Sequence, residues 1–142
     1  MVKGILFLLL LTSCLSSPAY SQEKTDTIVM PVEEQGSARI DFEQQVYDFG
    51  EFSKSKHPKQ KHKFKFKNNG SKNLYILQII TGCGCTTPEY TKEPIKPGDT
   101  GVVTVTFDAA SQRKGKFTKS ITVYTNDPRS FVRIFIKGKI EE

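Results

Sequence analysis

The sequence contains no tryptophan, only two histidines and only three cysteines among its 142 residues. The cysteines and histidines do not show zinc-finger spacing, and there is no aromatic-rich RNA-binding motif. We therefore expect no nucleic-acid partner, although the formal net charge is +6. The lysines are spread over residues 54–67 and 114–119 instead of forming one block, which favours anionic surroundings only weakly.

The sequence also lacks the residue pattern of a nucleophilic enzyme. Such an enzyme needs a histidine beside a serine or cysteine, with a carboxylate behind the histidine. His57 precedes Pro58, His62 lies in a lysine-rich stretch, and the strand pattern gives no reason to place His62 near Cys83. We expect a protein that is not an enzyme and that has no cofactor.

The N-terminal residues have the order of a secretory signal. Lys3 gives a positive charge, the apolar run ILFLLLL follows over residues 5–11, and small and polar residues come next. This run is too short to cross a bilayer as a helix. We expect residues 1–21 to be a signal peptide that directs the protein to the periplasm, the cell envelope or the medium.

Two processing sites compete in this segment. Ala19-Tyr20-Ser21 is a small-x-small site, and cleavage after Ser21 would release a chain that starts at Gln22. Leu11-Thr12-Ser13-Cys14 resembles a lipobox, and cleavage there would leave Cys14 lipidated. The part before Cys14 is short for a lipoprotein signal, so we favour cleavage after Ser21. We expect contact with a membrane only if Cys14 is lipidated.

The rest of the chain divides into a leader, residues 22–38, and a domain, residues 39–142. The leader is polar and mixed in charge without a sustained period, which predicts flexibility. The domain shows one short strand pattern after another and no helical periodicity. Strands are expected over residues 45–52, 61–67, 74–81, 101–107, 115–124 and 131–137. Six or seven short strands predict an all-β, immunoglobulin-like antiparallel β-sandwich of about seven strands, with a small barrel as the alternative.

Local features refine this prediction. Residues 74–81, LYILQIIT, are apolar on both faces except for Gln78, which predicts a central strand. Gly50 predicts a bulge or a bend in the first strand. Residues 68–71, NNGS, predict a tight turn because Asn-Gly tolerates positive φ, and residues 86–88 are expected in a loop.

Lysines alternate with His62, Phe64 and Phe66 along residues 61–67, so one face of this strand is basic. That face could bind an anionic glycan, lipid head group or nucleic acid. It could also be a solvated face whose lysines discourage edge-to-edge pairing. We favour the second interpretation, because a sandwich strand needs this alternation anyway.

Six motifs occur in order along the domain. They are VYDFGEF (46–52), FKFKNNGSKNLYI (64–76), GCGCTTPEY (82–90), IKPGDTGVVTVTFD (95–108), GKFTKSITVYTND (115–127) and IFIKG (134–138). Together they cover roughly residues 39–140 and resemble the domain-of-unknown-function 1573 family. The resemblance implies an exported bacterial protein with an immunoglobulin-like domain, similar to major-sperm-protein, ASH and PapD-like domains. It implies no activity, because the family is uncharacterised.

The last two cysteines, Cys83 and Cys85, are separated only by Gly84. In an extended segment their side chains point the same way, and three interpretations stay open. A disulfide would close a very small ring, stabilise little, be strained and therefore suit redox chemistry. Two thiolates could instead hold Cu(I), whereas zinc would need two further ligands. Both residues could also be small apolar side chains packed at a strand end.

The sequence thus predicts an exported, non-enzymatic domain that acts by contact with an unknown protein or envelope component. Strand addition at an open sheet edge is one plausible binding mode. A thiol site at Cys83 and Cys85, either a redox-labile disulfide or a Cu(I) site, is the alternative function.

Overall fold

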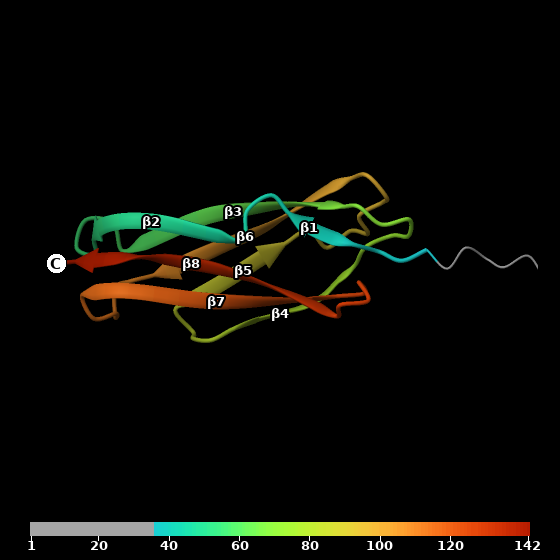
Figure 1. The fold of residues 1–142 in the computed structure, drawn as a ribbon. Coiled ribbons are helices and arrows are strands. Elements are labelled where there is room, and N and C mark those ends of the chain that lie inside the picture. The colour runs from blue at the N-terminus through green and yellow to red at the C-terminus, as the bar shows by residue number, and fades with distance from the viewer. Residues whose placement is uncertain (1–35) are drawn as a thin grey trace, which may run out of the picture. The chain divides into compact units, whose positions relative to one another are not determined.

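The computed structural model describes residues 36–142, which fold into strands and connecting segments (Figure 1). Within these residues, no helix is long and apolar enough to cross a membrane. The strands are β1 Ile40–Phe42, β2 Val46–Ser53, β3 Lys59–Asn68, β4 Ile76–Thr81, β5 Thr86–Tyr90, β6 Thr100–Asp108, β7 Gly115–Thr125 and β8 Phe131–Glu141. The predicted signal peptide, with Cys14 and Ser21, and the predicted leader up to residue 35 lie outside the described residues.

The strands form two four-stranded sheets, which pack face to face as a sandwich. One sheet has the order β1-β3-β6-β5 and the other the order β2-β8-β7-β4. Neighbouring strands are antiparallel except for β2 and β8, which run parallel. The predicted all-β sandwich is confirmed, and the barrel alternative is wrong. The structure has eight strands, slightly more than expected.

The core between the sheets follows from period-2 alternation along the strands. On β3, Phe64 and Phe66 are buried while the lysines beside them are exposed. The Phe107 ring, from one sheet, stacks on the Phe117 ring of the other with centroids 4.4 Å apart. The fully buried inner positions of β6, β7 and β8 are Val103, Val105, Phe107, Ile121, Val123, Ile134, Ile136 and Ile140. These faces are the ones that the alternation predicts.

The prediction of a central strand over residues 74–81 is wrong. Strand β4 starts only at Ile76, pairs with β7 and is the last strand of its sheet. Leu74 lies outside it, in an isolated bridge with Ile95, and is buried. Leu77, which lies where the register between β4 and β7 shifts, is 64% exposed, and Ile80 is 46% exposed, so these apolar side chains lie at the surface.

Residues 86–88, which the sequence placed in a loop, instead begin the edge strand β5. Pro88 has no N–H, and an edge strand tolerates this because only one of its sides needs a full ladder of hydrogen bonds. Strand β1 is also new, since three residues are too few to show a period. Both strands are edges of the same sheet.

The sequence predicts a special backbone conformation at two glycines, and the structure confirms only one of these predictions. Gly50 has a φ of 68° and lies where the register between β2 and β8 shifts, which confirms the predicted bulge. Gly70 has no positive φ, so the reason given for it is wrong. A Cβ at Gly70 would lie 2.2 Å from the carbonyl oxygen of Ser37 and 2.6 Å from the backbone nitrogen of Arg39. Gly70 is required because two backbone segments approach closely there.

Candidate functional site: the disulfide link and the exposed strand edge

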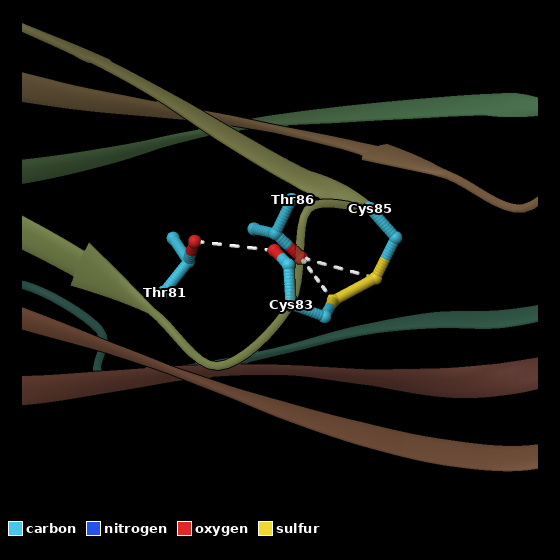
Figure 2. The surroundings of a disulfide bond; sticks show 4 residues. All are labelled: Thr81, Cys83, Cys85 and Thr86. Carbon is cyan, nitrogen blue, oxygen red and sulfur yellow. Dashed lines mark hydrogen bonds between the residues drawn. A yellow bond between two sulfur atoms is a disulfide. The ribbon is translucent and has the colours of Figure 1, made fainter.

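Cys83 and Cys85 lie in the link between β4 and β5, which carries the chain from one sheet to the other (Figure 2). Their sulfur atoms are 1.95 Å apart, at disulfide distance, and their Cα atoms are 5.3 Å apart. Both residues are half-buried, and Cys85 packs against the hydrophobic core. The structure therefore presents the pair as a disulfide. Its redox behaviour stays a prediction.

Apart from the disulfide, hydrogen bonds hold the backbone of this link in place. The Thr86 N–H donates to the Cys83 carbonyl at 3.3 Å, and the Thr81 hydroxyl donates to the same carbonyl at 3.2 Å. The Asp108 N–H donates to the Cys85 carbonyl at 2.8 Å. These bonds tie both cysteines to neighbouring strands whether or not the sulfurs are joined.

Thr86 is the one residue whose side chain reaches both sulfurs through a described hydrogen bond. Its Oγ1 lies 3.6 Å from Cys83 Sγ and 3.8 Å from Cys85 Sγ, as the dashed lines in Figure 2 show. Thr86 is only 4% exposed. No role was predicted for this threonine, because residues 86–88 were expected in a loop. Its position directly after the second cysteine was the available signal.

The Cu(I) interpretation requires a reduced pair, because thiolates are the ligands that select this ion. In the disulfide that the structure shows, neither sulfur is a thiolate. Among residues 36–142, no three His, Cys, Asp or Glu side chains gather in a way that could hold a metal ion. The Cu(I) hypothesis therefore stays a prediction about the reduced protein.

A second feature is the exposed apolar surface of the sheet β2-β8-β7-β4. Five large hydrophobic side chains are exposed in the described part of the chain, and all lie on this sheet or directly before β4. They are Val46 (43%), Tyr75 (42%), Leu77 (64%), Ile80 (46%) and Phe131 (41%). Tyr75, Leu77 and Ile80 lie on β4 or directly before it, whereas Val46 lies on β2, at the opposite edge of the sheet. Exposed apolar side chains that lie close together mark interaction surfaces more often than scattered ones do.

The lysine stripe lies on the outer face of β3 and is exposed. Lys61 pairs with Glu89 across the sheet at 3.7 Å. Strand β1 covers only Phe66–Asn68 of β3, so the first half of β3 is a sheet edge. Lysines along such an edge disfavour pairing with another chain, and this position supports the interpretation of the stripe as a protective solvated face.

Neither histidine is part of the disulfide link or of the exposed apolar surface. The ring of His62 stacks on Tyr47 with centroids 3.5 Å apart and meets the edge of Phe64 at 4.7 Å. Burial among these rings lowers the pKa of His62 below its usual value. His57 is exposed after β2. Contacts with the aromatic rings of Tyr47 on β2 and Phe64 on β3 indicate a packing role for His62.

Comparison with solved structures shows that the fold is similar to that of PapD-like domains. The chain is similar to the ASH/PapD-like domain of human CEP192, with a TM-score of 0.54 and 12% identity over 75% of this chain and 87% of that one. It is also similar to a protein of unknown function from Porphyromonas gingivalis W83, with a TM-score of 0.62 and 20% identity over 72% of this chain. It spans 46% of the length of that protein.

A third similar structure is the Vibrio cholerae VesB protease, with a TM-score of 0.55 and 14% identity over 75% of this chain but only 32% of the protease. At these identities the likeness shows the fold alone. The family model described as "Protein of unknown function (DUF1573)" matches residues 40–140, and the chain belongs to this family, as its motifs predicted. No curated protein matches the sequence.

Proposed function

We propose that this protein is an exported, non-enzymatic binding module of the bacterial envelope that holds an extended peptide segment of a partner protein along β4. The observation that carries the proposal is the position of β4. This apolar strand ends its sheet and carries Leu77 and Ile80 with 64% and 46% exposure.

The edge of β4 favours an extended partner over a globular one. Within the described residues β4 pairs with β7 on one side only, so its other side offers backbone N–H and C=O groups to an added strand. Strand addition uses those groups for affinity and the alternate side chains for specificity. An unprotected apolar edge otherwise promotes aggregation, and a regular occupant would remove that hazard.

The surface beside β4 indicates the chemistry of the occupant. Gln78 of β4 lies opposite Tyr124, and Tyr124 lies opposite Phe131 of β8. The Tyr124 and Phe131 rings contact each other with centroids 5.8 Å apart, and the Arg133 guanidinium lies 5.2 Å from the Phe131 ring. Together with Ile80 this surface suits a strand whose side chains towards it are apolar.

Two further observations support the assignment to a binding module. The PapD-like fold is shared with the CEP192 domain over nearly the whole of that domain. His62, on β3, contacts aromatic rings instead of a nucleophile. Export is supported by the signal-like order of residues 1–21.

Export and binding are tested separately. Fractionation of cells followed by intact-mass measurement should find the protein outside the cytoplasm, starting at Gln22. If the mature chain instead starts at a lipidated Cys14, the protein is exported and anchored to a membrane. A full-length protein in the cytoplasm would contradict export.

The binding test compares two edges of one sheet. The double variant Leu77→Lys/Ile80→Lys places charges on β4, and Val46→Lys is the matched control because Val46 is 43% exposed on β2, the opposite edge. Wild type and Val46→Lys should retain the same protein from envelope extract, and the double variant should lose it. In the retained complex, hydrogen exchange should slow at β4. Equal retention by all three proteins, or by none, would refute the proposal.

A further inference from the structure

The disulfide between Cys83 and Cys85 is poorly suited to stabilising the fold. It encloses a single residue, Gly84, so it removes little freedom from the unfolded chain. The link that carries it is already fixed by hydrogen bonds from Thr81, Thr86 and Asp108. Opening the S–S bond breaks none of these hydrogen bonds. The fold does not depend on this disulfide, so the S–S bond can open and close in a reaction while the domain stays folded.

The surroundings of the disulfide leave one of its sides open. Gly82 and Gly84 are exposed, and a Cβ at either position would meet no atom within 4 Å. Cys85 packs against the core, whereas Cys83 is half-buried without being part of that packing. An incoming thiol therefore has better access to Cys83.

We propose that Cys83 and Cys85 form a thiol–disulfide exchange site that accepts two electrons from a protein dithiol, with Thr86 as a positioning residue. The partner's thiolate attacks Cys83 Sγ and forms a mixed disulfide, while the Cys83–Cys85 bond breaks and Cys85 leaves as a thiolate. The partner's second thiol, after losing its proton, attacks its own sulfur in the mixed disulfide and releases Cys83. The partner ends as a disulfide, and its two protons are balanced by those that Cys83 and Cys85 take up.

Thr86 is placed to assist the step in which Cys85 leaves. Its Oγ1 is within 3.8 Å of both sulfurs, and among the described residues these sulfurs are its only side-chain hydrogen-bond partners. A hydroxyl that donates to a developing thiolate stabilises it, and a better leaving thiolate makes exchange faster. Because Thr86 is nearly buried, water replaces this donor poorly.

The first experiment asks whether the bond opens in the folded state. The oxidised full chain is treated with dithiothreitol under native conditions, and thiols are counted by alkylation and mass measurement while circular dichroism follows the fold. We expect two thiols to form with no change in the spectrum. If the thiols form only in denaturant, the proposal is wrong.

The second experiment tests Thr86. Thr86→Val keeps the shape and removes the hydroxyl, and we expect the rate constant for reduction by dithiothreitol to fall about tenfold. Thr86→Ser should restore the rate. The matched control is Thr87→Val, because Thr87 is the exposed neighbour on β5, and it should leave the rate unchanged. Equal rates for Thr86→Val and wild type, or an equal loss in Thr87→Val, would overturn the role of Thr86.

The third experiment compares how readily each cysteine, as a free thiol, reacts with an incoming partner. The variant Cys85→Ser leaves Cys83 alone, and Cys83→Ser leaves Cys85 alone. With glutathione disulfide as the probe, Cys83 should form a mixed disulfide at least several times faster than Cys85, because Cys85 packs against the core. Equal or faster reaction at Cys85 would contradict the better access to Cys83 on which the proposed order of attack rests. None of these variants alters β4, so failure here is distinguishable from failure of the peptide-binding proposal.

Discussion

The backbone N–H of Ile40 donates a hydrogen bond of 3.0 Å to Oδ2 of Asp127, a residue 87 positions later in the chain. Arg129 donates from Nε to Oδ1 of the same carboxylate at 3.0 Å and from a terminal nitrogen to Oδ2 at 2.6 Å. That terminal nitrogen also donates to the carbonyl of Ile40. Asp127 therefore fastens β1 to the turn between β7 and β8.

This arrangement makes the stability of the fold depend on pH in the acid range. The hydrogen bond from Arg129 is the main reason that the pKa of Asp127 is lowered from 3.8 to about 2. In the unfolded chain the carboxylate binds a proton near its ordinary pKa, while in the folded chain it stays charged. Its contribution, about 2 kcal/mol, is therefore full above about pH 5 and is lost as the pH falls through 4 towards 2.

The variant Asp127→Asn should remove that contribution, so its free energy of unfolding should decrease less as the pH falls. Urea unfolding at pH 7 and at pH 3 gives the free energy of unfolding at each pH. The difference between these two free energies should be smaller in the variant than in the wild type. Glu93→Gln removes the same charge from an exposed loop position and serves as the control. If both variants behave alike, Asp127 is not the origin of the acid dependence.

Gly70→Ala should be strongly destabilising. The added Cβ would lie 2.2 Å from the Ser37 carbonyl oxygen and 2.6 Å from the Arg39 nitrogen, and these backbone atoms cannot rotate away. We expect a loss of about 2–3 kcal/mol in the free energy of unfolding. Gly82→Ala is the control, since a Cβ there meets nothing within 4 Å and φ is not positive. An unchanged melting temperature for Gly70→Ala would contradict the close approach.

The inner faces of the sandwich were predictable, and its edges were not. Alternation identifies Phe64 and Phe66 as buried because a half-buried strand repeats every two residues. The same logic fails for β4, where a run that is apolar on both faces is typical of a central strand. It cannot reveal that Leu77 and Ile80 are left uncovered, because strand order depends on contacts far apart in the chain.

The candidate site was predictable only in part. The spacing of Cys83 and Cys85 is enough to suggest a sulfur pair, since both side chains of an extended stretch point the same way. The hydroxyl of Thr86 was missed because Pro88 made the stretch look like a loop, whereas an edge strand accommodates that proline. Once residue 86 is in a strand beside the link, its side chain meets both sulfurs.

His62 should give a second, separate pH dependence. Desolvation lowers its pKa in the folded state below 6.5, so the unfolded chain binds a proton first as the pH falls. Stability should therefore decrease as the pH falls below 6.5. His62→Phe keeps the stack on Tyr47 without a titrating group, and its loss of stability between pH 7 and pH 5 should be smaller than that of wild type.

The double variant Cys83→Ser/Cys85→Ser should be almost as stable as the oxidised protein. A ring of three residues removes little loop entropy, and the chain-entropy model gives at most about 2 kcal/mol for such a ring, compared with about 3 kcal/mol for a loop of 15 residues. The hydrogen bonds of Asp108 and Thr86 to the two cysteine carbonyls remain in the variant. Guanidinium unfolding of the variant and of the oxidised wild type measures the difference. A loss clearly above about 2 kcal/mol would mean that the disulfide stabilises the link, contrary to the exchange chemistry proposed for it.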